Sequence, residues 1–155
     1  MSDAMTHKML VVMARGRARS GKSHGHISVA VFQRGLYLDG WGSYPKGVVR
    51  EPDLEIHLYD TAAARSIEDS DEGYLRQLVA SDQAQASRWS FFGDNDCTDW
   101  VLRILRRMGF RTPTDRLLPV SLARAFQKHP DWTPYQVPYA APIQYGGSAP
   151  AGITT

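Results

Sequence analysis

Cys97 and His26 are the two residues whose types and settings could carry out chemistry together. Cys97 is the single cysteine and stands in the segment Asp-Asn-Asp-Cys-Thr-Asp-Trp, at the start of an amphipathic stretch. His26 follows a glycine and opens an alternating apolar run much earlier in the chain. A helix N-terminus presents N–H groups and a partial positive charge, both of which lower the pKa of a thiol. An imidazole can accept the thiol proton, so the pair predicts nucleophilic catalysis by a thiolate.

Each member of this pair has an alternative interpretation. A lone cysteine on the inner face of a helix is often a small, inert core residue. The place of Cys97 in a first helical turn with polar neighbours favours a nucleophile, and its backbone N–H would face a developing oxyanion. His24 lies two residues before His26 and is interpreted as a loop residue. It would share a strand face with His26 if the strand began earlier, so it stays a rival base.

A third group usually holds a histidine base in its working orientation. Asp39 is the candidate, because it is predicted on the strand after the His26 strand and on a face that can meet it. The alternatives are that Asp39 and Gly40 only form a turn, or that His57 is the orienting group. Carboxylates beside the thiol would oppose its ionisation, so they are interpreted as helix caps or substrate contacts. The candidate substrate contacts are Asn95, Trp41 and His24.

The remaining pattern predicts the elements that position these residues. Strict alternation of apolar and polar residues indicates strands, and apolar residues at spacings of three and four indicate helices. Gly109 is the expected stop of the cysteine helix. The strands are predicted at 8–14, 26–32, 36–41, 54–59 and 89–92, the second and third as an antiparallel hairpin, and the helices at 71–86, 97–108 and 118–127.

Composition narrows the function classes. The 155 residues predict a catalytic domain over 1–129, followed by a proline-rich extension over 130–155 that is partly disordered. A net charge of +2 gives no argument for nucleic acid, and the apolar stretches are too short for a membrane span or a signal peptide, so synthesis in the cytoplasm is expected. One cysteine excludes a disulfide framework and a cysteine zinc site, and His24 and His26 lack further ligands, so no metal and no cofactor is expected.

Two motifs together resemble a known family. Gly25–Val29 (Gly-His-Ile-Ser-Val) followed later by Asn95–Trp100 (Asn-Asp-Cys-Thr-Asp-Trp) is similar to the circularly permuted NlpC/P60 (papain-like) amidases and peptidases, over roughly residues 8–127. The resemblance implies an α+β fold, with an antiparallel sheet and the cysteine helix packed against it. It also implies Cys97 as nucleophile, His26 as base, Asp39 as a polar third member and a thioester intermediate. Relatives often carry Asn directly before the cysteine, whereas Asp96 stands there in this chain.

The resemblance also implies substrates and partners. The expected substrate is the peptide stem of peptidoglycan, cleaved by an antibacterial effector that a specialised secretion system exports to a target cell's periplasm. A cognate inhibitor (immunity) protein is then a candidate partner. The alternatives are a lipid acyltransferase or thiol esterase of the same fold, and a non-catalytic binding module that uses the basic loop 15–22.

Overall fold

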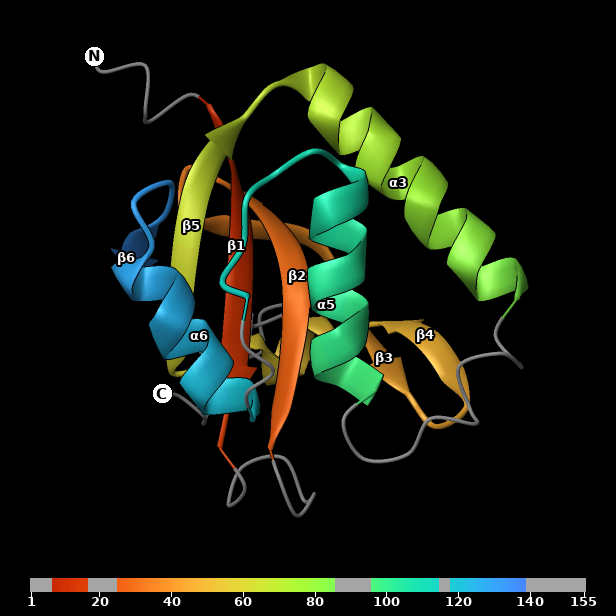
Figure 1. Ribbon diagram of the computed structural model, residues 1–155, viewed down its shortest axis with the longest axis horizontal. Coiled ribbons are helices and arrows are strands. Elements are labelled where there is room, and N and C mark those ends of the chain that lie inside the picture. Colours follow the sequence, from red (N-terminus) through yellow and green to blue (C-terminus); the bar gives the residue numbers. More distant parts are fainter. Residues whose placement is uncertain (1–6, 17–24, 86–95, 115–117, 139–155) are drawn as a thin grey trace, which may run out of the picture.

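The computed structural model describes residues 7–16, 25–85, 96–114 and 118–138. They form a six-stranded antiparallel sheet in the order β4-β3-β2-β1-β5-β6, with helices packed against it (Figure 1). The α+β class and the packing of the cysteine helix on an antiparallel sheet are therefore confirmed. The elements are β1 Lys8–Arg15, β2 His26–Gln33, β3 Leu36–Tyr44, β4 Gly47–Arg50, the 3-10 helix Asp53–Leu58, β5 Thr61–Ile67, α3 Asp69–Ala84, α5 Asp96–Arg107, α6 Pro119–Lys128 and β6 Thr133–Tyr135.

The helices cover one face of the sheet. α5 lies against β2 and β3, and α6 lies against β5 and β1 (Figure 1). The predicted apolar stripe of α5 is confirmed, because Val101, Ile104 and Leu105 are completely buried in the core on this face. α5 ends at Arg107, and the predicted stop residue Gly109 follows two residues later with a φ of +89°, which suits glycine in a helix C-terminal turn.

The opposite face of the sheet carries a second, smaller core. Phe32, Tyr59 and Ala62 are buried there, with Tyr37 and Tyr135 packed against them. The small residues Ser28 and Ala30 of β2 point toward this face, whereas α5 packs on the Ile27 face of β2.

A β-bulge decides which side chains of β3 face the helices. The register between β2 and β3 shifts between Val31 and Phe32, so that Asp39 lies opposite Val31 and Tyr37 lies opposite Phe32. One additional residue reverses the alternation of faces. Tyr37 therefore packs on Phe32, with ring centroids 5.7 Å apart, whereas Trp41 belongs to the core under the helices. Strict alternation along β3 would predict Tyr37, Asp39 and Trp41 on one face; this prediction is wrong, because the bulge places Tyr37 on the other face.

The segment predicted as a strand at 54–59 is a 3-10 helix instead. Pro52 precedes it, and the N–H of Glu55 bonds to the Pro52 carbonyl at 3.0 Å. Only Ile56 of this helix is buried, so the alternation of its residues does not reflect a half-buried strand. The predicted strand at 89–92 lies outside the described residues.

The proline-rich extension begins inside the sheet. β6 pairs antiparallel with β5, with Thr133 opposite Ala64 and Tyr135 opposite Ala62. The predicted disorder near the C-terminus falls on residues outside those described. None of the described helices is both long enough and apolar enough to cross a membrane.

Candidate active site

A buried polar cluster is centred on the carboxylate of Glu51. The Nε2–H of His26 donates to Glu51 Oε2 at 2.8 Å, and the Tyr44 hydroxyl donates to Oε1 at 2.7 Å. The hydroxyl of Ser28 also donates to Oε2 and lies 3.3 Å from the Tyr59 hydroxyl. The side chains of His26 and Glu51 have no exposed surface. A carboxylate buried this completely is stable only when its oxygens are bonded, and these donors supply the bonds.

The strands position this cluster through their alternation. His26 opens β2 and Ser28 follows two residues later, so both lie on the face opposite the helices. Tyr44 ends β3 on the same face, and its ring stacks on His26 with centroids 4.3 Å apart. Glu51 follows β4 directly, and its N–H bonds to the Gly40 carbonyl at 2.8 Å.

Gly42 makes room for the pair. A β-carbon at this position would lie 2.5 Å from His26 Nε2 and would also overlap Glu51 Oε2. The absence of a side chain is therefore a geometric requirement of the cluster.

The charge of Glu51 sets the electrostatics of the cluster. Burial alone would raise the pKa of Glu51, but the hydrogen bond and positive charge of His26, with the bonds from Ser28 and Tyr44, hold this pKa below its ordinary value. Burial and the nearby Glu51 charge raise the pKa of Tyr44 and of Tyr59, so both phenols stay protonated. The guanidinium of Arg15 lies 4.9 Å above the Tyr59 ring and adds a second cation.

Cys97 lies in the first turn of α5, where it was predicted, and is 6% exposed. α5 and β2 begin at the same end of the molecule (Figure 1). Cys97 belongs to the core under the helices together with Ile27, whereas His26, one residue earlier, contacts Tyr59 on the other side. The two predicted reacting groups therefore share one end of the sheet but lie on its opposite faces.

The structure does not bring Asp39 to His26. Asp39 lies opposite Val31, five residues along β2 from His26. Its carboxylate forms ion pairs with Arg50 at 2.5 Å and with Arg76 of α3 at 2.6 Å. The carboxylate that contacts the imidazole is Glu51, which the sequence reasoning missed.

The other predicted site residues are distributed differently. Trp41 is 5% exposed in the core, with the Arg76 guanidinium 5.4 Å from its ring centroid, so it is a packing residue. His57 lies half-buried on the 3-10 helix. His24 and Asn95 lie outside the described residues, as does the basic loop beyond Gly16.

Within the described ranges, no group of three or more His, Cys, Asp or Glu residues could hold a metal ion. Comparisons with protein-family models, with curated proteins and with solved structures find no match to this chain.

Proposed function

We propose that this protein is a cysteine hydrolase that cleaves an amide bond through a thioester. Cys97 is the nucleophile, His26 is the general base and Glu51 positions the imidazole. The observation that carries the proposal is the buried His26–Glu51 hydrogen bond of 2.8 Å, at the end of the sheet where the helix bearing the single cysteine begins.

Glu51 determines which imidazole nitrogen exchanges a proton. Because Nε2 is bonded to Glu51, the transferring nitrogen is Nδ1. The Cys97 proton is held on Nδ1, so that His26 is the cation paired with Glu51, and the Cys97 thiolate attacks the substrate carbonyl carbon. N–H groups of the first turn of α5 stabilise the oxyanion. The proton passes from His26 to the amine as the C–N bond breaks. A water molecule, deprotonated by His26, then cleaves the thioester and releases the acid.

The proposal requires the thiol and the imidazole to meet at the margin of the sheet. His26 is the first residue of β2. Around this end of the strand, side chains from the two faces of the sheet can approach each other. Gly25 precedes it with a φ of +83°, a backbone conformation that strands do not adopt.

The proposed substrate is the peptide stem of peptidoglycan, on the strength of the resemblance to permuted NlpC/P60 amidases. An exported antibacterial role and a cognate inhibitor belong to the same proposal. In a variant of this chemistry, a lipid or another acceptor takes the place of water and receives the acyl group of the thioester.

A non-catalytic binding module is the second candidate function. The separation of Cys97 and His26 by the sheet favours it, because each side chain then has a packing role on its own face.

The pH dependence of Cys97 alkylation by iodoacetamide tests the proposal, since a single thiol reports without ambiguity. In the wild type, we expect an apparent thiol pKa well below the free value of about 8.5. His26→Ala should raise it, and Glu51→Gln should raise it less. His57→Ala is the matched control and should leave it unchanged. If the thiol pKa is not lowered in the wild type and does not change in His26→Ala, the hydrolase proposal is contradicted and the binding module is favoured.

A further inference from the structure

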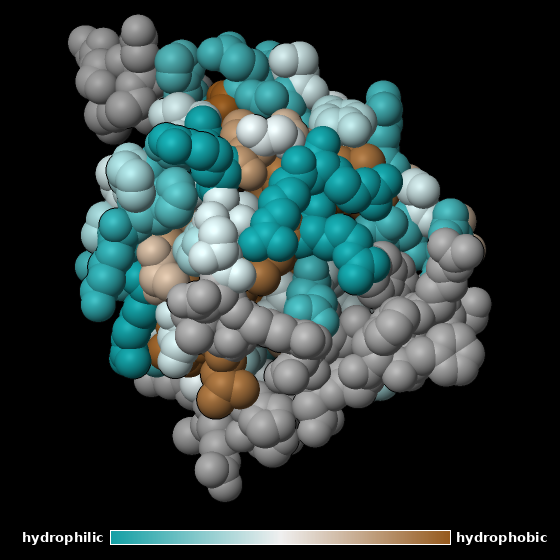
Figure 2. All heavy atoms as spheres, viewed as in Figure 1, coloured by the Kyte–Doolittle hydropathy of each residue, from teal (hydrophilic) through white to brown (hydrophobic). Residues whose placement is uncertain are grey.

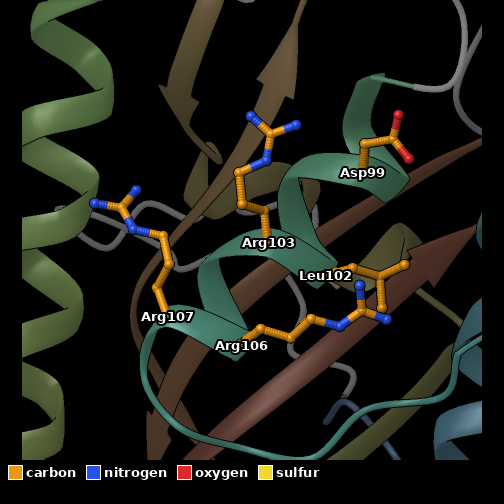
Figure 3. A pocket seen from close by; sticks show the side chains of 5 residues that line it. All are labelled: Asp99, Leu102, Arg103, Arg106 and Arg107. Carbon is orange, nitrogen blue, oxygen red and sulfur yellow. The ribbon is translucent and has the colours of Figure 1, made fainter.

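The solvent-facing side of α5 contains a cavity of about 510 Å³ that the proposed reaction does not use (Figure 3). Three of its five lining residues are arginines. The lining residues are Asp99, Leu102, Arg103, Arg106 and Arg107. Figure 2 shows strongly hydrophilic side chains over the C-terminal half of α5.

The helical period places these arginines in two neighbouring rows. Arg103 and Arg107 are four residues apart and form one row, while Arg106 lies in the other row with Leu102. Figure 3 shows the Arg107 side chain extending toward α3 and the Arg106 side chain extending past Leu102. The three side chains are exposed, so their guanidinium groups are accessible around one opening.

The guanidinium groups of Arg106 and Arg107 are held by contacts with the protein. Arg106 donates from Nε to the Thr112 hydroxyl at 2.9 Å and from Nη2 to the Pro113 carbonyl at 3.0 Å. Arg107 pairs with Asp82 of α3 at 3.3 Å. A guanidinium has five N–H donors, so these bonds leave donors for a ligand. Because the groups are already oriented, binding costs less side-chain entropy.

The charge around the cavity indicates the class of ligand. The three guanidinium groups are opposed by two carboxylates, that of the lining residue Asp99 and that of Asp82, which pairs with Arg107, so a positive excess is left that favours an anion. The attraction is local, because the whole chain carries only +2 and the adjoining helix α3 contains several acidic residues, of which Asp82 pairs with Arg107. A long polyphosphate would extend onto like charge, whereas a short run of carboxylates fits within the patch.

We propose that the Arg103, Arg106 and Arg107 face of α5 is a docking site for a short acidic segment of a partner protein. The segment's carboxylates pair with the guanidinium groups in the bidentate geometry that arginine favours. This docking is independent of hydrolysis, because the cavity opens to solvent while Cys97 is packed in the core beneath α5.

Fluorescence anisotropy with a labelled short oligoglutamate peptide tests the proposal on the full chain. We expect saturable binding that weakens as NaCl is added. Arg103→Glu should weaken it about tenfold, as expected for the loss of a charged, bidentate contact. Arg124→Glu is the matched control, because it makes the same charge change on an exposed arginine of α6 outside the cavity. It should leave the affinity unchanged.

Three outcomes overturn the proposal: no saturable binding, equal loss in both arginine variants, or tighter binding of a single-stranded oligonucleotide than of the peptide. Arg103→Ala serves as a second variant if the charge reversal lowers the thermal midpoint. Cys97→Ser should bind the peptide like the wild type. The docking proposal can therefore fail or succeed separately from the hydrolase proposal.

Discussion

His26 and Glu51 form a hydrogen-bonded pair, 2.8 Å from Nε2 to Oε2, in which neither side chain has exposed surface. The pair joins the first residue of β2 to the residue directly after β4, across β3. Since an uncompensated charge at this depth is costly, the two residues depend on each other for their ionised forms.

Glu51→Gln should lower the free energy of unfolding by about 3 kcal/mol, because it leaves the His26 charge buried without its partner. Urea denaturation at neutral pH measures this. Glu55→Gln is the control, since Glu55 is 45% exposed in its ion pair with Arg15 and its loss should cost less than about 1 kcal/mol. Equal losses in the two variants would contradict the buried ionised pair.

Acid should destabilise the wild type through Glu51. The pKa of this carboxyl is lower in the folded protein than its ordinary value of 4.5, so the folded state binds its proton less readily than the unfolded state. The stabilisation is therefore complete above the ordinary pKa and is lost as the pH falls through the folded value. Urea midpoints measured from about pH 6 down to about pH 3 should decline more steeply in the wild type than in Glu51→Gln. Parallel declines would refute the assignment.

Gly42→Ala should destabilise the fold by about 2 kcal/mol, because its new methyl group would overlap Glu51 and lie 2.5 Å from His26 Nε2. Gly73→Ala makes the same chemical change in α3, where a β-carbon meets no atom within 4 Å. That variant should be stabilised by about 0.5–1 kcal/mol, since alanine loses less conformational entropy in a helix. Thermal melts of the two variants should shift in opposite directions. A neutral Gly42→Ala would show that the cluster is looser than described.

Asp39→Asn tests whether Asp39 or Glu51 is the carboxylate that positions His26. It removes the charge that pairs with Arg50 and Arg76 but leaves the Glu51 cluster intact. The apparent pKa of Cys97 in alkylation should stay at the wild-type value, while stability falls by about 1 kcal/mol. A raised thiol pKa in Asp39→Asn, with none in Glu51→Gln, would restore Asp39 to the site.

Local patterns predicted the elements whose signals lie within one segment. The stripe through Val101, Ile104 and Leu105 repeats at the helical period, and Gly109 supplies the stop, so α5 could be predicted closely. The alternation after His26 predicted β2 in the same way. These signals depend on residues that are neighbours in sequence.

The remaining features depend on pairings between distant segments. β5 contains three consecutive alanines, which have low strand propensity, and it forms because β1 offers a partner. The bulge at Val31 and Phe32 reverses which face of the sheet the β3 side chains point to, and no periodicity in the sequence predicts it. Glu51 follows the four-residue strand β4. The only sequence signal for the contact between Glu51 and His26 was the position of this acidic residue directly after Gly-Val-Val-Arg.

β6 has a consequence for how the chain behaves in solution. Its three residues occupy the outer edge of β5, so the backbone of Ala62–Ala64 is paired instead of open. Open strand edges recruit strands from other molecules, and small side chains offer little steric resistance to that. The short C-terminal strand therefore protects the sheet from self-association, and a chain cut before Thr133 would carry a surface suited to growing aggregates.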